Sequence, residues 1–200
     1  RGMSETMGEV IDFRSMAVLP DDSDRALTQV KAVDGAWPIY GEVVLDPPMT
    51  IGEALAGGDL PGAVMGPLLA ERLGLEVGDA FRLGAQEFRL SARLVSAPDN
   101  ASAGFAFGPP TIVLSDDLGA SGLINEGTLF TTQYRLRLRE GADLERVKTQ
   151  VETALGDAGL RWRDARNGAP GTSEFIDRLG SFLVLVGLAG LAVGGVGISA

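Results

Sequence analysis

The sequence predicts an α+β domain that is followed by a membrane-spanning helix. Segments in which apolar and polar residues alternate indicate strands, and segments with apolar residues at helical spacing between capping residues indicate helices. The last twenty residues, SFLVLVGLAGLAVGGVGISA, contain no charged residue and no proline. The order of these segments, with strands first, a mixed middle part and then a strand, a helix and a strand, is typical of an α+β layer.

The first part of the chain predicts a β-hairpin and a third extended segment. Residues 10–19 and 27–33 carry apolar residues at strand-like positions, and the acidic turn Pro20–Asp24 separates them. The third segment, IYGEVVL, ends at two prolines, which lack the N–H that a central strand needs. Thr50 then suits a helix N-cap, with Glu53 at the capping-box position, so TIGEAL is predicted as a short helix.

The middle part predicts a helix that leads into a second hairpin. Pro67 suits the first helical position and Gly74 the residue after the last one, with Leu68, Leu69 and Leu73 expected on the apolar side. The strands AFRL and EFRLSARLV follow, joined at Gly84. Alternation in the second strand directs four side chains inward, namely Phe88, Leu90, Ala92 and Leu94.

The part before the apolar end predicts two strands, a helix and a last strand. TIVLS and QYRLRLR have the composition and alternation of strands. Asp143 is expected to open the helix DLERVKTQVETAL, and LRWRDA is expected to be the last strand. One face of this helix would carry its apolar side chains, which are Leu144, Val147, Val151 and Leu155.

The apolar end, 181–200, is long enough to cross a bilayer. At about 1.5 Å per residue it reaches roughly 30 Å, the thickness of the hydrocarbon core. The alternative is a buried core helix, which is usually shorter and carries a polar stripe. The helix is expected to begin outside the membrane as a stalk, with Ser173 or Thr172 as its N-cap and with Phe175, Ile176 and Leu179 along one side. Both chain ends are interpreted as cuts in a longer polypeptide.

Small residues within the apolar end predict that another helix packs against it. Gly190 and Gly194 are spaced as GxxxG, and Gly195 and Ser199 repeat the spacing. Such a surface lets two backbones approach closely in lipid, although glycine is also common in membrane helices in general.

Charge and composition exclude several classes of function. The chain has 27 acidic and 17 basic residues, a net charge of −10, so nucleic acid is not expected as a partner. The absence of histidine and cysteine removes the commonest general base, the thiolate nucleophile and the usual zinc ligands. No nucleotide-binding glycine motif and no nucleophile elbow occurs. We therefore expect no cofactor.

Two groups of residues leave alternatives open. The carboxylates of Asp21, Asp22 and Asp24, and those of Asp116 and Asp117, could form an acidic catalytic site, but a solvated turn and a helix start explain them better. Phe105 and Phe107, in a glycine-rich loop, could contact a hydrophobic cargo or partner, whereas core packing is the commoner role for such side chains.

Several stretches resemble the FtsX/MacB-like ABC-transporter permeases, in the branch with a large periplasmic domain described as lysophospholipase-type transport permeases. They include QVKAVDGAWPIYGEVVLDPP, FAFGPPTIVLS, QYRLRLREGADL and the whole segment from Arg161 onward. The resemblance implies a two-lobed periplasmic domain between a first and a second membrane span. It implies an α+β lobe at 1–36 and 129–170, a β-rich inserted lobe at 37–128, and a stalk and membrane helix at 171–200.

The function implied by this resemblance is that of a permease subunit in a bacterial inner membrane. A separate cytoplasmic ATPase subunit would hydrolyse ATP, and the periplasmic domain would transmit the motion to a lipid or hydrophobic cargo. The other expected partners are further spans of the same permease and a periplasmic protein. The alternative is a periplasmic binding or scaffold module that is held by a membrane anchor and transports nothing.

Overall fold

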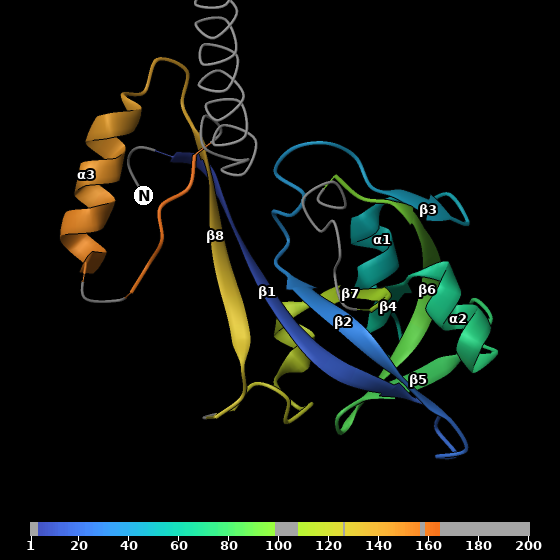
Figure 1. The fold of residues 1–200 in the computed structure, drawn as a ribbon. Helices are drawn as coiled ribbons and strands as arrows, with labels where there is room; N and C mark the ends of the chain where they lie inside the picture. Colours follow the sequence, from blue (N-terminus) through green and yellow to red (C-terminus); the bar gives the residue numbers. More distant parts are fainter. Residues whose placement is uncertain (1–3, 99–107, 126, 157–158, 165–200) are drawn as a thin grey trace, which may run out of the picture. The chain divides into compact units, whose positions relative to one another are not determined.

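The computed structural model describes residues 4–98, 108–125, 127–156 and 159–164. The chain divides into two compact units, Arg1–Ala142 and Asp143–Ala200, which are treated separately below. Every strand that the structure describes lies in the first unit, and the second contributes one described helix (Figure 1).

The predicted N-terminal hairpin is present and is longer than expected. β1 (Ser4–Val18) pairs antiparallel with β2 (Arg25–Val33), from Val10 opposite Val33 to Val18 opposite Arg25. The acidic residues form the turn, in which the N–H of Asp22 donates to the carbonyl of Leu19 at 3.0 Å. β1 also continues beyond the hairpin toward its N-terminal end, and this extension shapes the site described below.

The first unit is built on one mixed, eight-stranded sheet. Its order is β2-β7-β4-β6-β5-β1-β8, with β3 beside β6 and a further pairing between β1 and β2. That last pairing closes the strands from β2 round to β1 into a ring, and a closed ring leaves no open edge among its members. The remaining bounds are β3 (Val44–Asp46), β4 (Gly62–Met65), β5 (Ala80–Leu83), β6 (Gln86–Ser96), β7 (Pro110–Leu114) and β8 (Phe130–Leu138).

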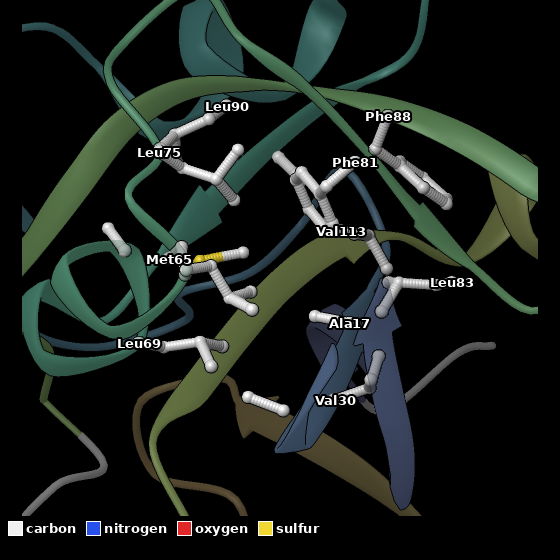
Figure 2. Packing of buried hydrophobic residues seen from close by; sticks show 14 of the residues in the cluster. Ala17, Val30, Met65, Leu69, Leu75, Phe81, Leu83, Phe88, Leu90 and Val113 are labelled. Atoms are coloured by element: carbon white, nitrogen blue, oxygen red, sulfur yellow. The ribbon is translucent and has the colours of Figure 1, made fainter. Parts of the chain in front are cut away.

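The core of the first unit consists of two apolar clusters. In the cluster drawn in Figure 2, Phe81 and Phe88 stack with ring centroids 6.1 Å apart, and Met65 and Val113 are fully buried nearby. The second cluster holds Trp37, Leu55 and Leu94 among its members. The inward residues predicted for β6 are all buried in one cluster or the other. Alternation alone was therefore sufficient to orient this strand.

Two short helices pack on the ring. α1 (Ile51–Ala56) has the predicted capping box between Thr50 and Glu53. α2 (Pro67–Leu73) ends at Gly74 in the left-handed conformation, as predicted. Leu68, however, is 75% exposed, which corrects its expected place on the apolar side. With 100° between successive helical residues, a face centred on Leu69, Ala70 and Leu73 turns Leu68 toward solvent.

Three strand predictions are corrected by the structure. β4 was not predicted, because its residues GAVM are buried on both faces and show no alternation. In the segment IYGEVVL, only the end belongs to a strand, as β3. Residues 160–164 of LRWRDA form no strand, since an extended segment becomes one only where its backbone groups find a pairing partner.

The predicted lobe boundaries stay a prediction. Strands from the predicted segments 1–36 and 37–128 are hydrogen-bonded to one another in the described sheet, as β1 with β5 and β2 with β7. A 3-10 turn, η1 (Ser115–Leu118), follows β7 where Asp116 and Asp117 were expected to begin a helix.

In the second unit, the structure describes α3 (Leu144–Leu155). Its N-cap is Asp143 as predicted, and the carboxylate accepts from the backbone N–H of Glu145 at 3.0 Å and of Arg146 at 3.2 Å. Of its predicted apolar face, Val147 is buried while Leu155 is largely exposed. No helix within the described ranges has the length and apolar character needed to cross a bilayer. The predicted stalk and span lie outside those ranges.

Candidate functional site at the end of the β1–β8 ribbon

All the site residues predicted from the sequence lie outside the described residues. These are the helix-packing residues Gly190, Gly194, Gly195 and Ser199, the stalk residues Ser173, Phe175, Ile176 and Leu179, and the loop residues Phe105 and Phe107. Their roles stay predictions.

The aspartates of the first turn act as turn residues. Asp21 accepts hydrogen bonds from the hydroxyl of Ser23 at 2.6 Å and from its backbone N–H at 3.1 Å, and the hydroxyl bond is the larger cause of the lowered pKa of Asp21. Asp22 pairs with Arg82. At the second pair, burial and then the charge of Asp116 raise the pKa of Asp117. Within the described ranges, no cluster of acidic side chains has the arrangement of a metal site.

A two-stranded ribbon with two different faces extends from the ring. Its strands are β8 and the N-terminal half of β1, which run antiparallel side by side (Figure 1). One face carries mainly apolar pairs, which are Met7 with Leu136, Glu9 with Tyr134, Ile11 with Thr132 and Phe13 with Phe130. The other face carries Thr6 with Arg137, Gly8 with Arg135, Val10 with Gln133 and Asp12 with Thr131. Because side chains alternate along a strand, Arg135 and Arg137 both belong to this second face, and Arg139 follows directly after the end of β8.

A β-bulge at the end of the ribbon places a carboxylate beside these arginines. Ser4 pairs with Leu138 and Thr6 with Arg137, so Glu5 is the extra residue. Simple alternation would put Glu5 on the apolar face with Met7. The shift instead brings its Oε2 to 3.4 Å from Nε of Arg137. Bulges commonly re-aim a side chain in this way beside functional sites.

The segment after β2 contacts the arginine face of the ribbon and reaches Arg137. The carboxylate of Asp34 accepts from the N–H of Glu9 at 2.8 Å, which ties the segment to β1. The side chain of Ile39 lies so close to Gly8 that a Cβ there would stand 3.2 Å from its Cδ1. The next residue, Tyr40, places its ring 5.5 Å from the guanidinium of Arg137. Arg137 thus contacts both a carboxylate and an aromatic ring.

A tight turn carries the last two charged residues of the site. The N–H of Ala142 donates to the carbonyl of Arg139 at 3.1 Å, and Gly141 has a φ of 77°. A positive φ at the third residue is what a type II turn requires, and glycine adopts it without strain. Arg139 and Glu140 therefore stand at the point where the chain leaves the ribbon.

The start of β1, the end of β8 and the turn after it border an open cavity of about 590 Å³. Its lining is Glu5, Arg137, Leu138, Arg139 and Glu140. Among the residues that the structure describes, the lining thus carries two positive and two negative side chains, in a chain whose net charge is −10. Arg139 and Glu140 line the cavity and have no side-chain hydrogen bond or ion pair within the described ranges.

Sequence reasoning identified only part of this site. The strand QYRLRLR was predicted, and its alternation already placed the arginines on one face. The sequence pattern could not identify Glu5 or Tyr40, because the position of Glu5 depends on the β-bulge and that of Tyr40 on the segment after β2. The turn glycine Gly141 was the one further signal present in the sequence.

Solved structures share this architecture. The periplasmic region of MacB from Actinobacillus actinomycetemcomitans aligns with a TM-score of 0.52 at 5% identity, over 79% of this chain and 69% of that one. The chain has the fold of a MacB-like periplasmic domain. The extracellular domain of the noncanonic ABC-type transporter YknZ from Gram-positive bacteria has the same fold, with a TM-score of 0.52 at 10% identity, over 80% of this chain and 79% of that one.

The chain also has a sequence relative among the ABC transporter permeases. Over 129 residues the chain is 26% identical to the uncharacterized ABC transporter permease YbbP of Escherichia coli (strain K12). The aligned part covers 64% of this chain but 15% of that relative. No protein-family model matches the chain. The α+β fold class and the resemblance to FtsX/MacB-like permeases are confirmed, whereas the lysophospholipase-type branch stays a prediction.

Proposed function

We propose that the chain is part of an ABC-transporter permease, and that its MacB-like domain transmits ATP-driven motion to a lipid or hydrophobic substrate outside the cytoplasm. The observation that carries the proposal is the combination of a MacB-like fold with sequence similarity to an ABC transporter permease. The fold supplies the domain type and the sequence relative supplies the transporter class.

The proposal assigns no enzymatic step to this chain. ATP would be hydrolysed by a separate cytoplasmic ATPase subunit, and the chain would lie at the bacterial inner membrane with its bulk on the periplasmic side. The predicted helix from Ser173 to Ala200 would connect the domain to the membrane, where Gly190 and Gly194 would pack against other spans. Phe105 and Phe107 stay candidates for contact with the cargo.

The test is to loosen the proposed connection between domain and membrane. Three glycines inserted between Gly171 and Thr172, in the full-length protein with its ATPase subunit, should interrupt the helix start and absorb the motion, because glycine is the most flexible residue. ATP hydrolysis should persist, while release of a fluorescent phospholipid from proteoliposomes should fall at least tenfold. Both rates are measured on the same preparation.

The matched control inserts the same three glycines between Gly58 and Asp59, in an exposed loop of the first unit. This variant should retain both rates. Lipid release that is unchanged by the first insertion would contradict mechanical transmission. A full-length protein that binds no ATPase subunit when the two are co-expressed would instead support the scaffold alternative.

A further inference from the structure

We propose that the cavity at the end of the β1–β8 ribbon binds the zwitterionic head group of an aminophospholipid, a phosphate ester that carries an ammonium group. The inference rests on the proposed function and names the chemistry of its lipid. The phosphate lies against Arg137 and Arg139, and the ammonium lies against Glu140. The cavity residues all belong to the first unit.

The charges of the lining favour a zwitterion over an ion of one sign. An anion would be attracted by the two arginines but repelled by Glu5 and Glu140. A cation would be attracted by the two glutamates but repelled by the arginines. A ligand with both charges close together pairs with both Arg139 and Glu140, which have no partner among the described residues. Arginine is suited to the phosphate because its planar guanidinium donates two parallel hydrogen bonds.

The arrangement holds Arg137 ready for such a ligand. Its guanidinium contacts Glu5 at 3.4 Å and lies 5.5 Å from the ring of Tyr40, so less side-chain freedom is lost when a ligand binds. The Glu5–Arg137 pair is itself exposed, with half or more of each side chain accessible, and adds little to stability. The stability that this pair adds therefore does not explain the β-bulge, whereas positioning an arginine for a ligand does.

The apolar face of the same ribbon favours a lipid over a soluble ester. Leu138 lines the cavity, and by alternation it follows Leu136, Tyr134 and Phe130 on that face. Tyr134 and Met7, on this face, are 55% and 52% exposed. Acyl chains that leave the cavity past Leu138 would meet apolar surface that solvent now covers.

The test is equilibrium binding to the purified full-length protein in detergent, measured by isothermal titration calorimetry. The probes are dihexanoyl phosphatidylethanolamine, dihexanoyl phosphatidylglycerol as an anion, and glycerophosphoethanolamine, which has the same head group without acyl chains. Arg139→Gln should weaken binding of the first probe about tenfold, the usual effect of removing a charge-assisted hydrogen bond. It should weaken binding of the phosphatidylglycerol as well.

Glu140→Gln separates a zwitterion site from an anion site. It should weaken phosphatidylethanolamine binding about tenfold, because the ammonium loses its partner, and should leave phosphatidylglycerol binding unchanged or tighter. The controls Arg25→Gln on β2 and Glu87→Gln on β6 remove one exposed charge of each sign elsewhere and should change every affinity less than twofold. The wild type should bind glycerophosphoethanolamine more weakly than the lipid.

Three outcomes would overturn the inference. Unchanged phosphatidylethanolamine binding in Glu140→Gln would show that Glu140 does not bind the ammonium group. Equal binding of the two lipids by the wild type would show that the cavity does not select a zwitterion. Glycerophosphoethanolamine that binds as tightly as the lipid assigns the cavity to a soluble ester. None of these results bears on the glycine-insertion experiment, whose readouts are ATP hydrolysis and lipid release, so failure of this inference can be distinguished from failure of the proposed function.

Discussion

Single glycines show how closely the chain packs in the first unit. Gly62 begins β4, and a Cβ at this position would press on the carbonyl oxygen of Ala54 and stand 3.0 Å from Oγ of Ser91. Gly52, in α1, has no atom within 4 Å of the corresponding position. The same substitution is therefore expected to have opposite effects at the two sites.

Gly62→Ala should destabilise the protein by about 2 kcal/mol, because backbone cannot move aside as a flexible side chain does. Gly52→Ala, the matched control, should stabilise it by roughly 0.5 kcal/mol, since alanine restricts the unfolded chain and suits a helix. Urea unfolding followed by tryptophan fluorescence measures both. Equal effects of the two substitutions would contradict the packing described for β4.

At the scale of elements, α1 depends on its capping box more than a long helix would. It spans Ile51–Ala56, and isolated helices of this length are unstable in water. The hydroxyl of Thr50 accepts from the N–H of Glu53 at 3.2 Å, and the carboxylate of Glu53 accepts from the N–H of Thr50 at 2.9 Å and from its hydroxyl at 2.8 Å. The bond from the Thr50 N–H is the main reason why the pKa of Glu53 is lowered from 4.5.

Thr50→Ala should lower the free energy of unfolding by about 1 kcal/mol at neutral pH. A carboxyl whose pKa is lower in the folded state stabilises the fold above its unfolded pKa, and this contribution disappears as the pH falls through the folded pKa. The cost of the substitution should therefore decrease below pH 4.5, the ordinary value for Glu53. Thermal unfolding of both proteins at neutral and acidic pH tests this. A cost that is independent of pH would exclude the side-chain bond to Glu53.

At the scale of the molecule, β1 connects two parts of the first unit that differ in the number of strands paired with them. Val10–Phe13 is paired on both sides, with β2 and with β8, whereas Ser4–Gly8 is paired only with β8. β8 in turn has no other strand partner among the described residues. Segments with fewer partners open more often than those in the closed ring.

Hydrogen–deuterium exchange should resolve this difference within one strand. Amides of 10–13 should exchange at least tenfold more slowly than those of 4–8, because the former open only with the ring. Peptides from β6, inside the ring, provide the slow reference. Uniform protection along β1 would mean that the ribbon and the ring unfold as one unit.

The sequence alone determined the local structure where a pattern carries its own physical cause. The acidic turn, the cap at Thr50, the glycine stop at Gly74 and the alternation of β6 were all predicted, since each depends on residues adjacent in the chain. β4 was missed and Leu68 was misplaced for the opposite reason. The burial of a four-residue run or of one helical side chain depends on which distant element packs against it.

Parts of the candidate site also follow from local sequence, and other parts only from the tertiary structure. Alternation along QYRLRLR determined which of its strand side chains share a face, because alternation is a property of the local backbone. Only the tertiary structure decided that the bulge at Glu5 and the segment after β2, at Tyr40, meet Arg137. Strand register and contacts between distant segments are set by long-range pairing, which no window of neighbouring residues contains.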